Sequence, residues 1–134
     1  MFSLTVTDHI MIAHSFKGEI FGPAQKLHGA TYTVEVSVTR AALDDEGLVC
    51  DIGLALQTLR EVLGRYNYTN LDEAPELRGR NTTTEFMAGE IFRSMKSRVQ
   101  AGALGPGTAD ALISMRVILR ESPVAWAGFE GSLR

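Results

Sequence analysis

The sequence predicts an α+β fold: an antiparallel sheet of four strands, with two helices packed on one of its faces. Three observations support this prediction. Segments near both ends of the chain alternate apolar and polar residues, two central segments carry apolar residues at helical spacing, and 134 residues suit one domain. The resulting order is strand, strand, helix, helix, strand, strand, which is typical of a sheet covered by helices on one face. We therefore treat residues 1–134 as a single domain.

The first two predicted strands lie before residue 40. Residues 2–14 form the first, and its last inward-facing residues are Ile10, Ile12 and His14. A loop over residues 18–26, rich in Gly, Pro and polar residues, separates it from the second strand. Residues 31–39 alternate cleanly, so one face of this strand is apolar and buried. The residues on that face are Tyr32, Val34, Val36 and Val38.

Two helices follow. A turn over residues 44–47 and a short apolar piece over 48–50 precede Asp51, whose carboxylate suits the N-cap of the first helix. Thr82-Thr83-Thr84-Glu85 has the spacing of a capping box before the second helix. The predicted core-facing stripe of the first helix is Ile52, Ala55, Leu56, Leu59, Val62 and Leu63. The corresponding stripe of the second is Ala88, Ile91, Phe92, Met95 and Val99.

The chain ends in two more predicted strands, over residues 113–120 and about 124–131. Glu121 continues the apolar parity of the first of these, which predicts a carboxylate on the inward face. A sheet of this kind has unpaired edges, and oligomerisation is a common way to close them.

Composition excludes several classes of partner. A net charge of −3 and scattered basic residues give no electrostatic footprint for nucleic acid or an anionic membrane surface. No apolar run approaches the ~20 residues that span a bilayer. The N-terminal residues lack the basic and apolar regions of a signal peptide, so we expect a cytoplasmic protein. The single cysteine, Cys50, cannot form an internal disulfide.

Two histidines indicate an incomplete metal site. His14 ends the first predicted strand and His28 precedes the second, whereas Ala30, where a third ligand would fall, cannot donate to a metal. A catalytic zinc ion normally has three protein ligands and an open position, so two imidazoles form a weaker site. Glu19 and His9 are candidate replacements, although His9 has the wrong strand parity. The alternative is that both histidines hydrogen-bond a ligand or water.

Six short motifs occur in a recognisable order. They are Ile12-Ala13-His14, Leu27-His28-Gly29-Ala30-Thr31-Tyr32, Gly47-Leu48-Val49-Cys50-Asp51, Asn70-Leu71-Asp72-Glu73, Thr83-Thr84-Glu85 and Arg120-Glu121-Ser122. Together they resemble the family of 6-pyruvoyl-tetrahydropterin synthase and 6-carboxytetrahydropterin synthase, over almost the whole chain. The resemblance implies the tunnelling fold. It also implies a homo-oligomer, a trimer or a hexamer, with sheets joined into a barrel and sites at subunit interfaces.

The resemblance also implies a set of functional positions. The family binds zinc through three histidines, moves protons with a cysteine and an Asp-His pair, and converts dihydroneopterin triphosphate. In this sequence the cysteine position is Ala24, and the Asp-His pair aligns with Asn67 and Tyr68. The zinc position keeps His14 and His28 but has Ala30 as its third member. The positions that would bind the pterin ring, Thr83, Thr84 and Glu121, all keep suitable side chains.

Each candidate also has a simpler interpretation. Glu121 can accept two parallel hydrogen bonds from a pterin edge, or it can be an exposed glutamate at a strand end. Helix capping alone explains the threonines, and their hydroxyls can still line a pocket. Lys26, Arg78 and Arg80 can meet a phosphate or form an ordinary solvated surface. Cys50 suits a buried structural thiol, and the Tyr68 phenol could act as an acid or base only if its surroundings perturbed it strongly.

These observations predict a divergent member of the family that binds a pterin or related bicyclic compound. If it is an enzyme, we expect a lyase-type step assisted by His14 and His28, with zinc only if a replacement ligand exists. The first alternative is a non-catalytic pterin-binding or structural homo-oligomer. The second is a working 6-carboxytetrahydropterin synthase with substitute residues from a neighbouring subunit. A solvent-excluded polar cluster around Asn67, Tyr68 and His28 would favour a new reaction.

Overall fold

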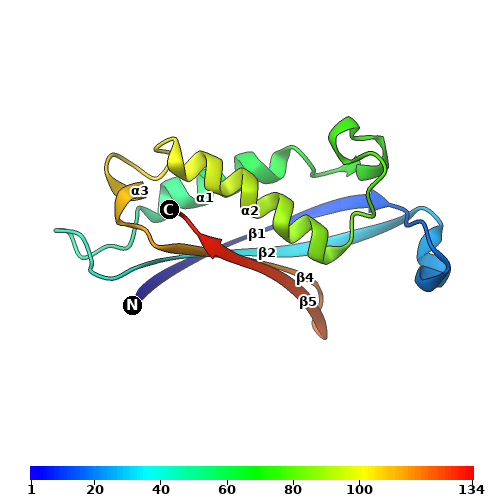
Figure 1. The fold of residues 1–134 in the computed structure, drawn as a ribbon, viewed down its shortest axis with the longest axis horizontal. Helices are drawn as coiled ribbons and strands as arrows, with labels where there is room; N and C mark the ends of the chain where they lie inside the picture. Colours follow the sequence, from blue (N-terminus) through cyan, green and yellow to red (C-terminus); the bar gives the residue numbers. More distant parts are fainter.

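The computed structural model describes all residues from Met1 to Arg134 and has one sheet with helices on a single face (Figure 1). The long strands β1 (Phe2–His14), β2 (His28–Arg40), β4 (Ser114–Ser122) and β5 (Ala125–Ser132) pair antiparallel in that order. The predicted α+β class is therefore confirmed, as are the four antiparallel strands. The strand count is corrected to five, because the two-residue strand β3 (Thr69–Asn70) pairs parallel to β1 at the sheet edge. A two-residue strand has no periodicity for a sequence pattern to reveal.

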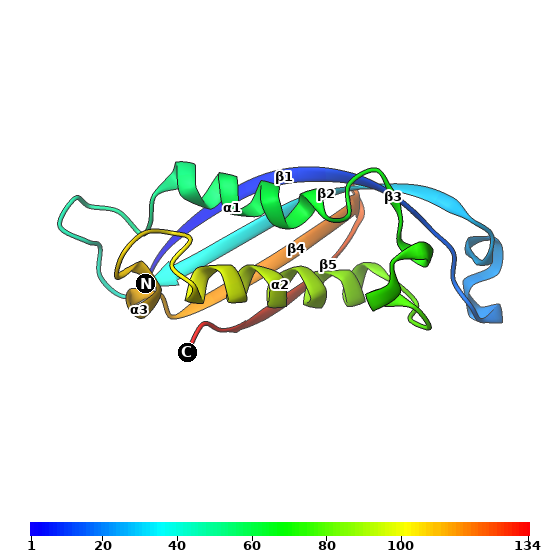
Figure 2. The ribbon, with the colours of Figure 1, turned by 90° about the horizontal axis from the view of Figure 1, so that it is seen from above.

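The helices α1 (Ile52–Gly64) and α2 (Thr84–Gln100) lie side by side over the sheet, with a short α3 (Thr108–Ala111) after them (Figure 2). Helix α1 packs on β1, and α2 packs on β4 and β5. The predicted inward residues of β1, β2 and α2 are buried. Ile52 and Leu56 of α1 were expected in the core but are 54% and 38% exposed. They lie one turn apart on the outer side of the helix, and no further layer covers that side.

The helix caps differ in detail from the sequence prediction. Asp51 caps α1 as predicted, and its Oδ1 accepts a hydrogen bond from the Leu54 N–H at 2.9 Å. The cap of α2 is Thr83, whose hydroxyl accepts from the Phe86 N–H at 3.1 Å. The predicted capping box is therefore wrong: the N-cap is one residue later, which puts Phe86 rather than Glu85 at the third helical position, and Thr82 turns inward and is 1% exposed. The apolar piece before Asp51 forms no strand.

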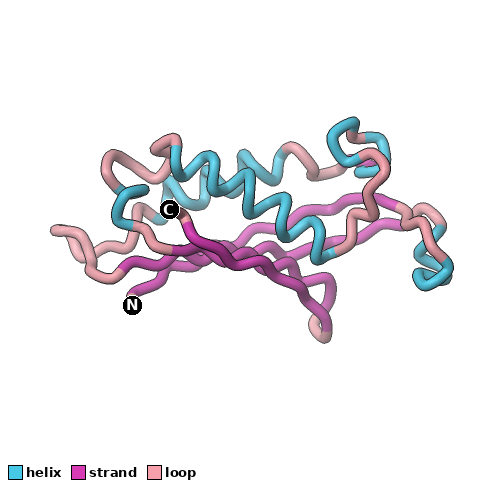
Figure 3. The backbone as a smooth tube through the Cα atoms, viewed as in Figure 1, coloured by secondary structure: helices cyan, strands magenta, loops and turns pink.

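The connecting segments contain short 3-10 helices where the sequence indicated loops (Figure 3). Glu19–Gln25 forms one between β1 and β2, and Leu71–Glu73 and Pro75–Leu77 form two more before α2. Figure 2 shows these segments gathered at one end of the sheet, where β1 ends, β2 begins and the β4–β5 turn lies. That end carries the candidate site. No helix combines the length and apolar character needed to cross a membrane.

Candidate functional site

His14 and His28 meet at this end of the sheet. They are direct partners in the β1–β2 ladder, with ring centroids 4.6 Å apart in an edge-on arrangement. His14 is 1% exposed, and its imidazole lies on the helix-covered face. The structure therefore brings together the two histidines that the sequence singled out.

Each imidazole is oriented through its Nδ1 atom. The Nδ1 of His14 lies 3.0 Å from the Oγ1 of Thr82. The Nδ1 of His28 lies 2.9 Å from the backbone oxygen of Lys26, and because a carbonyl only accepts, this nitrogen is the donor. The Nε2 of neutral His28 is consequently an acceptor. Burial, followed by the charge of neighbouring His28, lowers the pKa of His14, so its neutral form is favoured.

Two phenylalanines of the β1–β2 connection cover the histidines. The Phe16 ring lies 4.5 Å from that of His14 and 5.5 Å from that of His28, and Phe21 lies 4.8 Å from Phe16. The Phe16 N–H donates to the Ala24 carbonyl at 3.1 Å, which folds the connection back over the site. The sequence pattern indicated neither phenylalanine, because both lie in a non-periodic segment.

A three-ligand zinc site is not formed by this chain. Ala30 lies opposite Ile12 in the ladder, on the strand that carries His28, and offers no donor atom. Both candidate replacements fail: Glu19 is exposed in its 3-10 helix, and His9 is exposed on the other face of the sheet. No group of three or more His, Cys, Asp or Glu side chains is placed to hold a metal ion. The two oriented imidazoles supply only two of the expected ligands.

The residues at the family's proton-transfer positions do not form an enclosed cluster in the single chain. Ala24 has no ionisable group. The Oδ1 of Asn67 accepts a hydrogen bond from the Met11 N–H at 2.9 Å, and the Tyr68 N–H donates to the Met11 carbonyl at 2.7 Å. These two residues thus attach the chain to the edge of β1. The Tyr68 side chain is 78% exposed, and its backbone has a left-handed φ of 61°.

The predicted ring-binding residues, in contrast, lie together. The Oγ1 of Thr84, the first residue of α2, donates to Glu121 Oε2 near the end of β4 at 3.4 Å. Thr84 is 9% exposed, whereas Glu121 is exposed at the rim and free to meet a ligand. The hydroxyl of Thr83 already accepts a hydrogen bond at the helix cap. Thr84 and Glu121 are therefore the better candidates for contact with a ligand.

A basic pocket of about 400 Å³ adjoins the histidines. Arg78 and Arg80 line it, as does Lys17, which sequence analysis did not identify. Ser15 also lines the pocket and follows directly after His14. Its N–H and hydroxyl donate to the carboxylate of Asp72 at 3.2 and 2.5 Å. Lys26 does not line this pocket, but its carbonyl orients His28.

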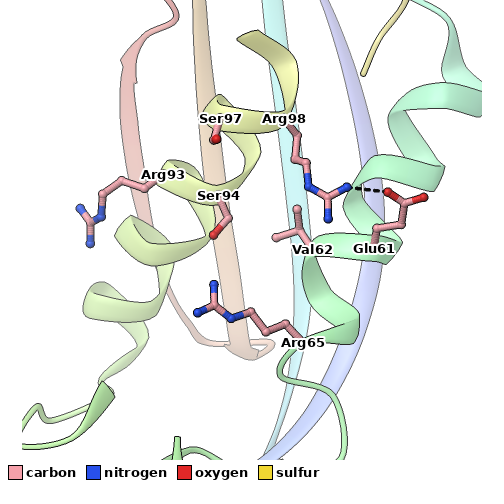
Figure 4. A pocket seen from close by; sticks show the side chains of 7 residues that line it. All are labelled: Glu61, Val62, Arg65, Arg93, Ser94, Ser97 and Arg98. Carbon is pink, nitrogen blue, oxygen red and sulfur yellow. Dashed lines mark hydrogen bonds and ion pairs between the residues drawn. The ribbon is translucent and has the colours of Figure 1, made fainter. Parts of the chain in front are cut away.

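A second hollow, of about 410 Å³, lies between α1 and α2 (Figure 4). Its arginines are paired with glutamates: Arg98 with Glu61 at 2.6 Å across the two helices, and Arg65 with Glu76 at 2.8 Å. None of the residues that line it belongs to the histidine site. Exposed ion pairs of this kind contribute little to stability.

Comparison with known proteins identifies the family of this chain. Residues 3–132 match the family described as "6-pyruvoyl tetrahydropterin synthase". The chain belongs to this family. The 6-carboxy-5,6,7,8-tetrahydropterin synthase of Bacillus subtilis is 26% identical over 129 residues, which cover 93% of this chain and 82% of the relative. The 6-pyruvoyl tetrahydrobiopterin synthase of Dictyostelium discoideum is 34% identical over 84 residues, or 58% of this chain and 62% of the relative.

The fold agrees with this membership. The structure of the 6-pyruvoyl tetrahydropterin synthase of Caenorhabditis elegans superposes with a TM-score of 0.81 at 21% identity, covering 98% of this chain and 96% of the other. That of the Plasmodium vivax enzyme gives 0.78 at 16% identity, with 97% of each chain covered. The expected tunnelling fold is confirmed.

Proposed function

We propose that this member of the pterin synthase family binds a pterin or a related bicyclic compound, whose ring is held by Glu121. The observation that supports this most directly is the Thr84–Glu121 hydrogen bond at the rim of the histidine site. A carboxylate accepts two parallel hydrogen bonds from an amino group and a neighbouring ring N–H, the pair of donors on the pterin edge. The rest of the ring would then extend toward Phe16 and the histidines.

The side chain of the ligand would reach the basic pocket. Lys17, Arg78 and Arg80 favour an anionic substituent there, and Asp72 offsets part of their charge. A lyase-type step at this point would use His14 and His28 as proton acceptors, since neutral imidazoles accept protons near neutral pH. Such a step would differ from the family's reaction, because Ala24 and Asn67 cannot act as bases.

The first alternative is a non-catalytic pterin-binding or structural homo-oligomer. It is favoured by Ala24 and Asn67, neither of which can act as a base. The second is a working 6-carboxytetrahydropterin synthase that takes its missing groups from a neighbouring subunit in a trimer or hexamer. Exposed Tyr68 is free to contribute to such an interface. A shared zinc ion would likewise need a third ligand from that subunit.

Ring binding is tested by equilibrium dialysis of the purified protein against neopterin, a fluorescent pterin. Glu121→Gln keeps the size of the side chain but turns one acceptor into a donor that opposes the pterin edge, so we expect affinity to fall at least about tenfold. Glu130→Gln is the matched control, because Glu130 is exposed on the opposite face of the sheet. Equal affinity of wild type and Glu121→Gln would refute the proposal.

Catalysis is tested separately with dihydroneopterin triphosphate, by measuring the release of inorganic triphosphate. The proposal expects release far below that of a family member with the complete cysteine and Asp-His set, measured in parallel. Comparable release would favour the alternative in which a neighbouring subunit supplies the missing groups.

A further inference from the structure

Asn81 joins the two segments that line the basic pocket beside the histidines. The Lys17 N–H donates to Asn81 Oδ1 at 2.8 Å, and Asn81 Nδ2 donates to the Lys17 carbonyl oxygen at 3.0 Å. Lys17 lies between β1 and the following 3-10 helix, and its backbone has no other hydrogen bond. One side-chain amide, 64 positions away in the sequence, therefore fixes the backbone at Lys17.

The three basic side chains of this pocket have no carboxylate partner. Neither Lys17 nor Arg78 nor Arg80 takes part in an ion pair. The one acidic residue in the lining, Asp72, accepts hydrogen bonds from Ser15. The hollow between α1 and α2 differs, because each arginine there is paired with a glutamate. The basic pocket thus keeps N–H donors free for an anionic group.

These cations come from two separate parts of the chain. Lys17 belongs to the connection after β1, whereas Arg78 and Arg80 belong to the segment before α2. One anionic group can contact all three only if the two segments keep a fixed separation. The ammonium of lysine sits on a flexible stem, so the place of its backbone limits where it can reach. Asn81 directly follows Arg80 and binds the backbone of Lys17, so it sets that separation.

We propose that Asn81 is a positioning residue for ligand selectivity: its amide holds Lys17 beside the two pocket arginines, so that the pocket prefers a pterin with a phosphorylated side chain to one without. This inference rests on the proposed function, in which Glu121 holds the ring and the side chain of the ligand reaches this pocket. Its physical basis is preorganisation, because a segment that is fixed before binding loses less conformational freedom when the ligand binds.

The test compares the affinities for neopterin triphosphate and neopterin in equilibrium dialysis. We expect wild type to bind the triphosphate at least about tenfold more tightly. Asn81→Ala should reduce this ratio roughly three- to tenfold, the range of one charge-assisted contact in an accessible pocket, and should leave neopterin affinity unchanged. Gln25→Ala is the matched control, because the Gln25 amide donates to the Gly22 carbonyl at 3.1 Å in the same connection but does not line the pocket.

Lys17→Met shows whether Asn81 acts through Lys17. This substitution removes the ammonium and keeps an unbranched side chain, so it should reduce the ratio at least as much as Asn81→Ala does. The variant with both substitutions should bind both ligands as Lys17→Met does, because no cation is left for Asn81 to position. Additive losses would overturn the proposal, since they would show that Asn81 contacts the phosphates itself.

The remaining outcomes separate this proposal from the ring anchor. If Asn81→Ala keeps the wild-type ratio, or if wild type binds neopterin without preferring the triphosphate, the role of Asn81 is overturned and the ring anchor stands. Equal losses of both ligands in Asn81→Ala would also overturn it, because they would reflect general loosening of the connection. If the wild-type protein binds neither ligand, both proposals fail.

Discussion

The two sides of the histidine pair differ in what their side chains do. On the ring-binding side, Thr82 and Thr84 are buried and hydrogen-bonded, to His14 and to Glu121. On the proton-transfer side, Ala24 has only a methyl group and Asn67 is occupied by the backbone of β1. Buried polar groups are costly unless they have partners, so the first side is a consistent polar network. The difference is therefore one of polar side chains: on one side they are buried and partnered, whereas on the other there is a methyl group and an amide committed to the backbone of β1.

The largest effect is expected from completing the metal site. Ala30→His would add the missing donor two residues from His28, on the same face of β2, and should raise bound zinc from well below one to about one ion per chain. Metal content is measured by mass spectrometry on protein purified without added metal or chelator. Thr31→His is the control, because the next residue points to the opposite face. One zinc per wild-type chain would contradict the expectation and indicate a ligand from another subunit.

A smaller effect is expected at the buried hydroxyl that orients His14. Thr82→Val keeps the shape but leaves Nδ1 of the buried imidazole without a partner, which should lower the free energy of unfolding by about 1–3 kcal/mol. Urea denaturation measures the change. Thr82→Ser keeps the hydroxyl and should lose less. If both variants lose the same free energy of unfolding, the effect comes from packing. The hydrogen bond between Thr82 and His14 would then contribute no measurable stability.

On the other side of the site, Asn67 should matter for the fold alone. Asn67→Ala removes the acceptor of the Met11 N–H and should lower the free energy of unfolding by about 1 kcal/mol or less, because water reaches this sheet edge. Asn67→Asp keeps an acceptor and should unfold like wild type. Neopterin affinity should be the same in all three proteins. A selective loss of affinity in Asn67→Ala would place this residue in the binding site.

The smallest effect is expected for Tyr68. Its side chain is exposed, so Tyr68→Phe should change the free energy of unfolding by less than about 0.5 kcal/mol and leave neopterin affinity unchanged. Thermal denaturation and equilibrium dialysis test the two statements. A clear loss of neopterin affinity would contradict this expectation, because it would show that Tyr68 enters a ligand site in the assembled oligomer.

Much of this fold was predictable because its elements are long and periodic. The alternation in β2 and the stripe of α2 correctly identified the buried faces, and Asp51 was correctly identified as a cap. The errors lie where local patterns conflict with packing. Ile52 and Leu56 have helical spacing but face solvent, since one helix surface can be apolar without a layer to cover it.

The candidate site was predictable in part. The motifs identified His14, His28 and Glu121, and strand parity predicted an inward face for His14 and Glu121. The motifs did not predict that Thr82 would support His14, since the capping-box spacing assigned it to the helix end. Lys17, Phe16 and Phe21 were missed because non-periodic connections carry them.

The sequence by itself determined the secondary structure of the long elements, the face each presents to the core, and the absence of a donor at Ala30. The tertiary structure alone decided which distant side chains meet. The hydrogen bond of Thr84 to Glu121 depends on how the first turn of α2 meets the end of β4. The contact of Thr82 with His14 depends on how the preceding 3-10 segments bring α2 to the sheet. Local patterns fix orientation because they repeat within one element, whereas contacts between elements depend on register and connection geometry, which no repeat encodes.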